Sequence, residues 1–504
     1  MNRSIIKFIL GHVLVIEGLL MLLPCAVALF YGEGVGVWYL LSAALAFALG
    51  MLLRLRKPKS TVFYLKEGCM TTALSWLMLS FFGCLPFWLG GEIPSFTDAM
   101  FETVSGFTTT GASILSDVES LSHAALFWRS FTHWIGGMGV LVFLLAIIPM
   151  SGGGGSNMNL MKAESPGPSV GKLVPKIKAT ARLLYIIYLA MTVLEFILLL
   201  FGKMNVFESM CTAFGTAGTG GFGFKNDSFA SFSPYIQWVV TIFMILFGVN
   251  FNFYYFMLYR QFKKALLMEE VRYYFIIIIL AITVIFANIL DMTAGIADAI
   301  RQSSFQVASV ITTTGFSTVD FNMWPSLSKT ILVLIMFCGA CAGSTGGGMK
   351  VSRFIILFKS MGKELNSYIH PKSIQKIKLD KKPVEHEVVR ATNAFVVAYL
   401  IVYVVSLVII ALDGRDLITT FTSVAATINN IGPGLELCGP ASNFGFFSIP
   451  SKFVLMFDML AGRLEIFPML LLFYPGAWKD MLSKNSKKKD KSFEKKESKL
   501  LEKA

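Results

Sequence analysis

Ten apolar runs constrain the fold of this chain more than any other feature. A helix needs about 20 apolar residues to cross the ~30 Å hydrocarbon layer of a bilayer. Of the 504 residues, 55% are hydrophobic, and the mean hydropathy is +0.66, which is too apolar for a soluble protein. The sequence therefore predicts an all-α polytopic membrane protein. The runs cover residues 5–31, 36–54, 69–91, 123–150, 181–202, 234–260, 271–292, 326–358, 388–413 and 450–475.

Lysine and arginine residues predict the orientation of these runs, because short cytoplasmic loops carry an excess of basic residues. With the N-terminus inside, the cytoplasmic segments hold 36 of the 44 basic residues. The net charge of +13 mostly reflects this bias. The basic tail contains a single aromatic residue, Phe493, so it suits anionic lipid headgroups better than nucleic acid. We expect both termini to be cytoplasmic. The basic segments are Arg54–Lys66, Lys162–Arg182, Arg260–Arg272, Lys350–Arg390 and the tail from Lys479, with Arg3 and Lys7.

Four Thr/Gly-rich turns recur between the apolar runs. Thr-Thr-Thr-Gly occupies residues 108–111 and 312–315, and weaker versions occupy residues 218–222 and 429–432. The predicted orientation places all four turns on the outer side. Non-helical backbone persists at membrane depth only where protein buries it or water wets it. We therefore expect the four turns to surround one aqueous path.

A short helix-like stretch precedes each turn. Such stretches are too short to cross the membrane and long enough for three helical turns. As re-entrant half-helices they would aim the negative ends of their dipoles at the axis, which favours a cation there. The stretches are Phe96–Phe107, Val206–Ala217, Ala297–Ile311 and Asp416–Ile428, with Asp98, Glu208, Asp298 and Asp416 near their starts.

Glycine beside threonine predicts a filter of main-chain oxygens, because glycine adopts backbone conformations closed to other residues. A ring of carbonyl oxygens can replace the hydration shell of an ion. The turns contain no Asp or Glu, which favours K⁺ over Ca²⁺; the alternative is that the glycines only permit close helix packing. The expected filter residues are Thr109, Thr110, Gly111, Thr219, Gly220, Gly221, Thr313, Thr314, Gly315, Asn430, Ile431 and Gly432. Within this set, K⁺ is expected at Thr110, Gly111, Gly220, Gly221, Thr314, Gly315, Ile431 and Gly432.

A second glycine-rich segment interrupts the apolar run after the third turn. Residues 339–348 include five glycines, and each costs a helix about 1 kcal/mol relative to alanine. We expect this segment to unwind, to lie across the cytoplasmic half of the pore and to act as a gate; the alternative is a static kink. The expected gate residues are Gly339, Gly343, Gly346, Gly347, Gly348, Lys350 and Arg463. Arg463 has Asp458 and Glu465 nearby in sequence, so it either borders the pore or forms a structural salt bridge.

Enzymatic chemistry has little support in the sequence. Residues 218–223 match G-x-G-x-x-G, but this dinucleotide fingerprint requires a βαβ unit and here lies between membrane helices. No nucleophile–base pair or metal cluster falls at a shared depth. We expect neither an enzyme nor a cofactor bound by this chain itself.

The four turns closely resemble those of the membrane subunit of bacterial Trk-type potassium uptake systems, in the Trk/Ktr/HKT superfamily of K⁺ transporters. The resemblance covers roughly residues 65 to 475, and the two additional N-terminal helices are similar to the Trk branch. It implies four helix–pore-loop–helix repeats around one pore and a homodimer with one pore in each subunit. It assigns Gly111, Gly221, Gly315 and Gly432 to the filter, residues 339–348 to an intramembrane gating loop, and Arg463 to the arginine of the last helix.

The boundaries that we expect follow these repeats. The N-terminal helix pair occupies residues 1–66, the four pore repeats occupy residues 67–155, 156–265, 266–365 and 366–478, and the basic tail occupies residues 479–504. The third repeat is expected to contain the broken second helix.

The resemblance also implies regulation by a partner. Members of the family are controlled by a cytosolic ring of nucleotide-binding subunits, so NAD or ATP would act only through that ring, docked on the basic loops Lys162–Arg182 and Lys350–Arg390. The expected function is channel-like uptake of K⁺, the transported ion, across the bacterial inner membrane. A K⁺/H⁺ or K⁺/Na⁺ symporter is the alternative, weakened by the few buried carboxylates available to carry a proton.

Overall fold

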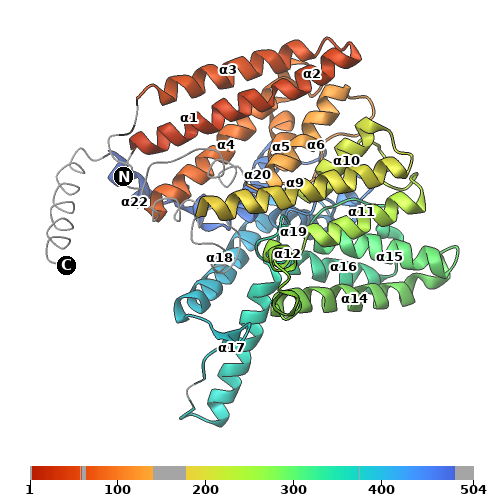
Figure 1. Cartoon of the computed structure of the whole chain (residues 1–504), viewed down its shortest axis with the longest axis vertical. Helices are drawn as coiled ribbons and strands as arrows, with labels where there is room; N and C mark the ends of the chain where they lie inside the picture. Colours follow the sequence, from red (N-terminus) through yellow and green to blue (C-terminus); the bar gives the residue numbers. More distant parts are fainter. Residues whose placement is uncertain (1–2, 57, 59–63, 140–176, 374, 483–504) are drawn as a thin grey trace.

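The computed structural model of the chain describes residues 3–56, 58, 64–139, 177–373 and 375–482. Helices dominate this part of the chain, and many of the long ones run alongside one another (Figure 1). The all-α fold expected from the sequence is confirmed. Residues 140–176, with most of the basic segment 162–182, and nearly all of the basic tail lie outside the described residues.

The N-terminal helices form one edge of the molecule (Figure 1). The contact between the first and third helices depends on small residues, since a Cβ at Gly11 would lie 2.7 Å from Gly50 O, and a Cβ at Gly18 would lie 2.7 Å from Ala43 O. Small residues permit such close approach of membrane helices. The helices are α1 (Arg3–Leu20), α2 (Leu22–Tyr31) and α3 (Gly36–Arg54).

The rest of the chain repeats one order of elements four times: a long first helix, a short pore helix, an extended turn and a second helix. The first helices are α4 (Leu65–Leu89), α9 (Ile177–Phe201), α14 (Glu269–Ile289) and α18 (His386–Ile410). The pore helices are α5 (Phe96–Phe107), α10 (Val206–Gly218), α15 (Ile296–Ile311) and α19 (Leu417–Ile428). The second helices are α6 (His123–Gly137), α11 (Pro234–Phe247) with α12 (Phe251–Leu258), α16 (Ser326–Cys338) with α17 (Val351–Ile369), and α20 (Ile449–Arg463) with α21 (Phe467–Phe473).

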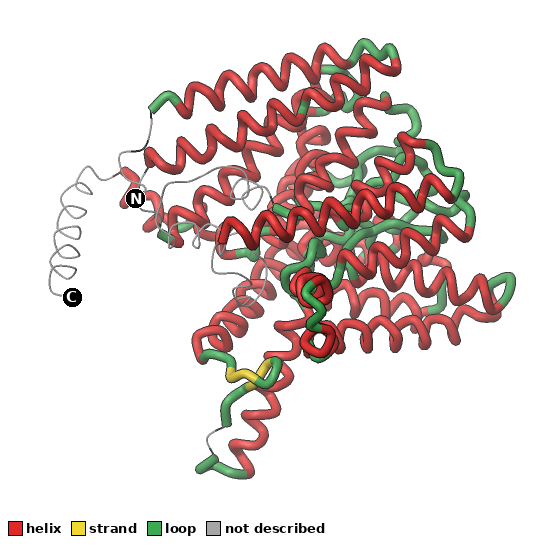
Figure 2. The backbone as a smooth tube through the Cα atoms, in the orientation of Figure 1, coloured by secondary structure: helices red, strands yellow, loops and turns green. Residues whose placement is uncertain are grey.

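Short elements complete the described fold. Strands β1 and β2 pair antiparallel beside α17, where Figure 2 shows them in yellow. Figure 2 also shows loops that run through the interior of the helical body. The short elements are α13 (Phe262–Leu266), α22 (Pro475–Leu482), β1 (Lys378–Leu379), β2 (Lys382–Pro383), and the 3-10 helices η1 (Leu290–Met292), η2 (Phe321–Met323), η3 (Ala411–Asp413) and η4 (Glu436–Cys438).

All four predicted half-helices are present, and their ends agree with the sequence-based bounds to within one residue. The starts of three of them follow from side-chain capping, in which a polar side chain accepts a hydrogen bond from one of the free backbone N–H groups of the first turn, whereas α15 begins after Gly295 without such a cap. Ser95 caps α5, Asn205 caps α10 and Asp416 caps α19 through the N–H group three residues later in each case.

The second helices differ from the prediction. The sequence predicts a break only in the third repeat, and the structure confirms that break between Cys338 and Val351. Two further predicted crossings are also broken. α11 and α12 meet at 92°, because Asn250 leaves the helix and caps α12 by accepting from Asn252 N at 2.9 Å. The run at 450–475 is interrupted after Arg463 by residues with positive φ.

The ten predicted crossings are therefore not all single unbroken helices among the described residues. Six helices there are long and apolar enough to cross a membrane, or seven if α11 and α12 are counted as one span. The predicted run at 123–150 begins as α6, and its part beyond residue 139 lies outside the described residues.

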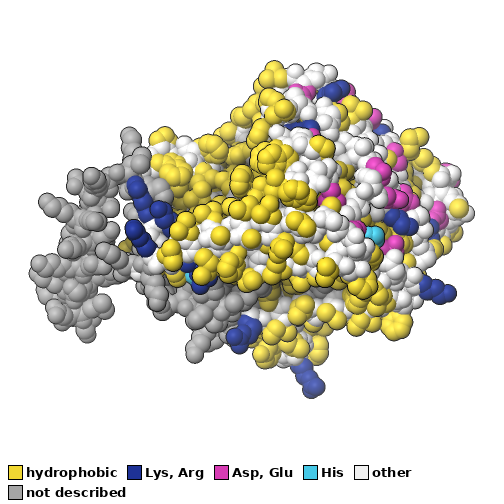
Figure 3. Space-filling view, turned by 90° about the horizontal axis from the view of Figure 1, so that it is seen from above, with side chains coloured by type: hydrophobic (Ala, Val, Ile, Leu, Met, Phe, Trp, Pro, Cys, Tyr) yellow, Lys and Arg dark blue, Asp and Glu magenta, His cyan; other side chains and the backbone are white. Residues whose placement is uncertain are grey.

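The surface carries the pattern of a membrane protein. The face shown in Figure 3 is largely hydrophobic, with acidic side chains gathered toward one end and a group of Lys and Arg side chains at the opposite end. Exposed large apolar side chains occur on helices throughout the chain, including Leu29, Leu45, Ile279 and Val404. A soluble monomer rarely exposes contiguous apolar area on this scale.

Candidate ion-conduction site

The four turns share one unusual backbone conformation. The second residue of each turn has a left-handed φ of +54° to +61°, and the glycine two residues later has a φ of +76° to +94°. Left-handed φ is rare for a β-branched residue such as threonine and persists only where the surrounding structure enforces it. The second residues are Thr109, Thr219, Thr313 and Asn430, and the glycines are Gly111, Gly221, Gly315 and Gly432.

The four turns meet in a closed ring. A side chain on any of the four glycines would collide with the backbone oxygen that precedes the glycine of the next turn. The sequence of contacts runs from the first turn to the second, third and fourth, and then back to the first. The pairs are Gly111 with Gly220 O, Gly221 with Thr314 O, Gly315 with Ile431 O, and Gly432 with Thr110 O. The structure thus brings all the predicted filter segments together, while ion binding by them stays a prediction.

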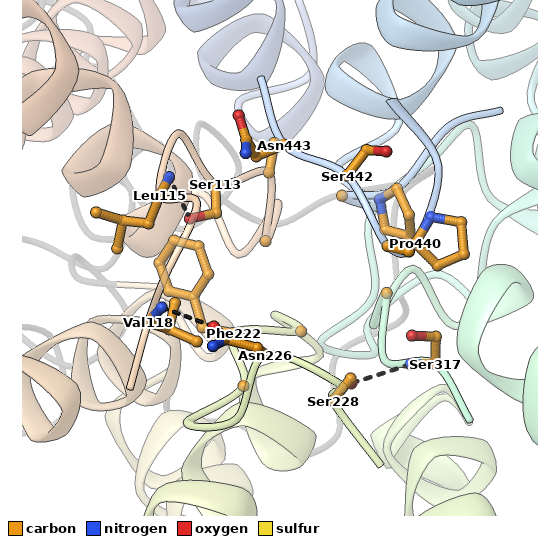
Figure 4. A pocket seen from close by; sticks show the side chains of 18 of the residues that line it. Ser113, Leu115, Val118, Phe222, Asn226, Ser228, Ser317, Pro440, Ser442 and Asn443 are labelled. Atoms are coloured by element: carbon orange, nitrogen blue, oxygen red, sulfur yellow. Dashed lines mark hydrogen bonds between the residues drawn. The ribbon is translucent and has the colours of Figure 1, made fainter. Parts of the chain in front are cut away.

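A cavity of about 130 Å³ contacts all four glycines of this ring. It lies on the side of the ring that is predicted to face outward, called the outer side below. Figure 4 shows labelled side chains from all four repeats around this opening, including Ser113, Asn226, Ser317 and Ser442. The lining is predominantly polar, with hydroxyl, amide and main-chain groups. Such a lining suits a hydrated ion before it enters a narrower path.

Side-chain hydrogen bonds of hydroxyl and amide groups stabilise the turns of the ring. The Thr108 and Thr110 hydroxyls lie 2.8 Å apart in the first turn, and the Thr312 and Thr314 hydroxyls lie 2.7 Å apart in the third. The fourth turn lacks the threonines. Its Asn430 instead donates to Thr110 Oγ1 at 2.9 Å and to a backbone oxygen of α20 at 2.8 Å. The turn that departs most from the repeated motif is therefore tied directly to the first.

A buried ion pair supports the outer side of the ring, and sequence reasoning missed it. Arg129 Nη2 of α6 lies 2.8 Å from Glu102 Oε1 of α5, and both side chains are almost fully buried. Glu102 also accepts from Ser113 Oγ and Ile114 N after the first turn, and Arg129 donates to Gly223 O after the second. The available signal was two ionisable residues within predicted membrane segments, where such residues are costly and usually functional.

His133 also joins the first two turns and was not predicted. Its Nε2 accepts from Phe222 N at 3.1 Å, and its Nδ1 lies 2.7 Å from Gly106 O. An Nε2 that accepts must be unprotonated, so the proton is assigned to Nδ1, which donates to Gly106 O. The neutral imidazole thereby connects the end of one pore helix to the backbone after the second filter glycine.

The predicted gate segment lies against the inner side of the ring. Residues 339–350 separate α16 from α17 without helical structure. Gly347 N donates to Thr313 Oγ1 at 2.6 Å, and a Cβ at Gly347 would lie 2.7 Å from Asn429 O. Lys350 is buried and donates back to Gly346 O. The segment therefore contacts the third and fourth turns, and its movement as a gate stays a prediction.

Arg463 lies beside this loop. It donates to Thr345 O at 2.7 Å and to the backbone oxygens of Gly136 and Gly137, at the end of α6, at 2.6 and 2.7 Å. The acids near it in sequence have partners of their own: Glu465 forms an ion pair with Arg353, and Asp458 accepts from a serine of α18. The predicted position of Arg463 at the pore fits these contacts with the loop.

Comparisons with known proteins agree on one family. Residues 39–483 match the TrkH family, described as a cation transport protein. The chain is 37% identical to the "Trk system potassium uptake protein TrkH" of Salmonella typhimurium, over 95% of this chain and 100% of that protein. It is 32% identical to the "Trk system potassium uptake protein TrkG" of Escherichia coli K12, again over 95% and 100%. The crystal structure of the potassium transporter TrkH from Vibrio parahaemolyticus superposes with a TM-score of 0.85 at 33% identity, over 95% of this chain and 100% of that one.

Proposed function

The chain belongs to the TrkH family of cation transport proteins, and from this premise we propose that it takes up K⁺ by channel-like flow through the ring of the four turns. Its relatives of similar length are named as potassium uptake proteins. The carbonyl oxygens of residues 110–111, 220–221, 314–315 and 431–432 would replace the water around a K⁺ ion. The loop at 339–350 would open and close the path below them.

One observation carries this proposal. Each filter glycine leaves just enough room for the carbonyl oxygen of the next turn, and the four contacts close on themselves. Glycines that served only helix packing would need no such order, because helix pairs pack independently of one another. A closed order of main-chain oxygens supports a single axis along which a dehydrated cation can pass.

The same proposal includes the setting of the protein. We place it in the bacterial inner membrane with both termini in the cytoplasm, as the basic segments favour. We further propose a homodimer with one pore in each subunit. A cytosolic ring of nucleotide-binding subunits would dock on the basic loops, so that NAD or ATP would act through that partner and not on this chain.

Coupling to protons is the second candidate, because the structure buries more carboxyl groups in membrane helices than the sequence analysis allowed. Glu17 of α1, Glu195 of α9 and Asp458 of α20 are all fully or almost fully buried. Among the described residues, Glu17 has no hydrogen-bond partner for either carboxyl oxygen. A carboxyl group in such a place is costly when charged and can accept a proton.

Purified protein in liposomes separates the two candidates. Channel-like flow predicts K⁺ flux that follows the K⁺ gradient and the voltage and is unchanged when a pH or Na⁺ gradient is imposed. Coupled transport predicts flux that collapses with the gradient of the second ion.

Serine variants test the filter assignment in the same liposomes. Gly111→Ser and Gly315→Ser should lower the K⁺/Na⁺ flux ratio. Gly34→Ser, where an added side chain meets nothing within 4 Å, should leave the ratio unchanged. An unchanged ratio in both filter variants would remove the filter assignment.

A further inference from the structure

Glu270 is a buried acid that belongs to neither the proposed filter nor the proposed gate residues. It lies in the first turn of α14 and is 6% exposed. Its carboxylate accepts hydrogen bonds at two breaks in the second helices, the break between α16 and α17 and the bend between α11 and α12. Oε1 accepts from Ala342 N at 2.7 Å and from Ser352 N at 3.1 Å. Oε2 accepts from Asn250 Nδ2 at 3.3 Å.

The two backbone contacts lie at opposite ends of the loop 339–350. Ala342 belongs to its first residues, and Ser352 lies in the first turn of α17, whose own cap residue, Lys350, provides no capping side-chain bond. The first turn of a helix has unpaired N–H groups and a partial positive charge, which a carboxylate satisfies. Glu270 thus supplies from α14 the cap that the local sequence of α17 lacks.

The third contact joins the loop to the bend between α11 and α12. Asn250 lies in that bend, and backbone hydrogen bonds also join the bend to the loop. Cys341 N donates to Gly248 O at 3.1 Å, Phe251 N donates to Gly343 O at 3.0 Å, and Thr345 N donates to Phe247 O at 3.4 Å. The loop cannot leave its position without releasing both Glu270 and the bend.

We propose that Glu270 is a positioning residue that latches the loop 339–350 against the α11–α12 bend and so holds the pore closed. The proposal rests on the proposed function of the loop as a gate. Release of the latch would free both ends of the loop together and break its backbone hydrogen bonds with the bend of the second repeat. The inner gate would therefore be shared between the second and third repeats.

The latch can be tested with a substitution that keeps the shape of the side chain. Glu270→Gln leaves one carbonyl oxygen and places an NH₂ group against an N–H donor or against the Asn250 amide. We expect passive K⁺ flux into liposomes to rise at least threefold with an unchanged K⁺/Na⁺ ratio, because the filter is untouched. Asn250→Ala should raise the flux by a smaller factor. Asp291→Asn, which neutralises an exposed acid in η1 just after the other end of α14, is the matched control and should leave the flux unchanged.

Thiol labelling gives a readout of loop position that is independent of transport. Cys341 lies within the loop and is fully buried, as is Cys211 in α10. Reaction with 2-aminoethyl methanethiosulfonate, followed by peptide mass spectrometry, should become at least threefold faster at Cys341 in Glu270→Gln and stay unchanged at Cys211. Faster labelling at both thiols would show general loosening of the fold and would overturn the latch.

A loop-shortened chain separates this inference from the proposed function. Deletion of residues 345–347 removes the part of the loop beneath the third and fourth turns. If the deletion raises K⁺ flux while Glu270→Gln changes neither flux nor Cys341 labelling, the gate stands and the latch is wrong. If neither the deletion nor Glu270→Gln changes the flux, the loop is not the gate and both proposals fail.

Discussion

Each filter glycine leaves space that a backbone oxygen of the next turn occupies. The ring can therefore form only because these four residues have no side chain. The glycines are not equally restricted. An added Cβ at Gly221 or Gly315 would overlap a carbonyl oxygen deeply, whereas at Gly432 the nearest atom, Thr110 O, would lie 2.9 Å away. All four also adopt left-handed φ, which costs a residue with a side chain about 1–2 kcal/mol.

This difference predicts a graded response to alanine. Gly221→Ala and Gly315→Ala should lower K⁺ uptake at least tenfold, because backbone must move to admit the methyl group. Gly432→Ala should retain a measurable share of uptake, since a shift of a few tenths of an ångström relieves its contact. Rb⁺ uptake by cells that lack other potassium transport would measure the order. Equal loss in all three variants, at equal protein level in the membrane, would contradict the ring geometry.

His133 offers a second prediction for a single residue. Asparagine can keep the donor toward Gly106 O, glutamine can keep the acceptor for Phe222 N, and leucine keeps neither. A buried group left without its partner costs about 1–3 kcal/mol, so the second turn should lose its fixed position. We expect the Na⁺/K⁺ flux ratio in liposomes to rise several-fold in His133→Leu and by smaller factors in His133→Asn and His133→Gln. If all three His133 variants had the same Na⁺/K⁺ flux ratio as the unaltered chain, His133 would not position the filter.

At the scale of secondary-structure elements, the sequence predicted the pore helices well, because residues next to the helix ends determine where most of these helices begin and end. Ser95, Asn205 and Asp416 are capping residues, and a glycine-rich turn follows each helix. The break at residues 339–350 was equally visible, since five glycines cannot hold a helix. The bend at Asn250 was not visible, because single glycines such as Gly248 are common in membrane helices. Its cause is also partly a contact with the loop, about 90 residues later in the chain.

The contacts of Arg463 lead to a prediction for the loop and the last repeat. Its guanidinium donates to Thr345 O and would place a positive charge beside the proposed ion path below the ring. Arg463→Gln removes that charge and weakens the hold on the loop, so both effects should raise cation flux, by about threefold or more. Arg415→Gln, which alters an exposed arginine before α19, should not change the flux. Liposome flux at fixed voltage measures both variants, and an unchanged rate in Arg463→Gln would exclude a pore role for this residue.

For the whole molecule, the sequence predicted the all-α membrane class, which is confirmed, and an order of elements that recurs four times along the chain, but not how the repeats meet. The orientation in the membrane stays a prediction. The ring contacts join residues about 100 to 320 positions apart, such as Thr110 with Asn430, and no local pattern encodes such a pairing. The same applies to the pairs Glu102–Arg129 and Glu270–Ala342. The charged residues Glu102, Arg129 and Glu270 were visible in the sequence, whereas their partners depend on the packing of separate elements.

The orientation predicts which surfaces reagents reach from each side. Ser120 and Ser373 are both exposed and lie on opposite sides of the membrane in the proposed topology. Ser120→Cys should react with a membrane-impermeant maleimide in intact cells, and Ser373→Cys should react only after permeabilisation. The unaltered chain, labelled in parallel, corrects for its native cysteines. Labelling of Ser373→Cys in intact cells would contradict the cytoplasmic placement of the basic loops.

Anomalous diffraction from crystals grown in Rb⁺ tests the central claim most directly, because Rb⁺ substitutes for K⁺ and can be located by its own signal. The account predicts an anomalous peak on the axis enclosed by Gly111, Gly221, Gly315 and Gly432, surrounded by main-chain oxygens of all four turns. An axis without a peak in Rb⁺-saturated crystals, or a peak bound by side chains away from the ring, would contradict it.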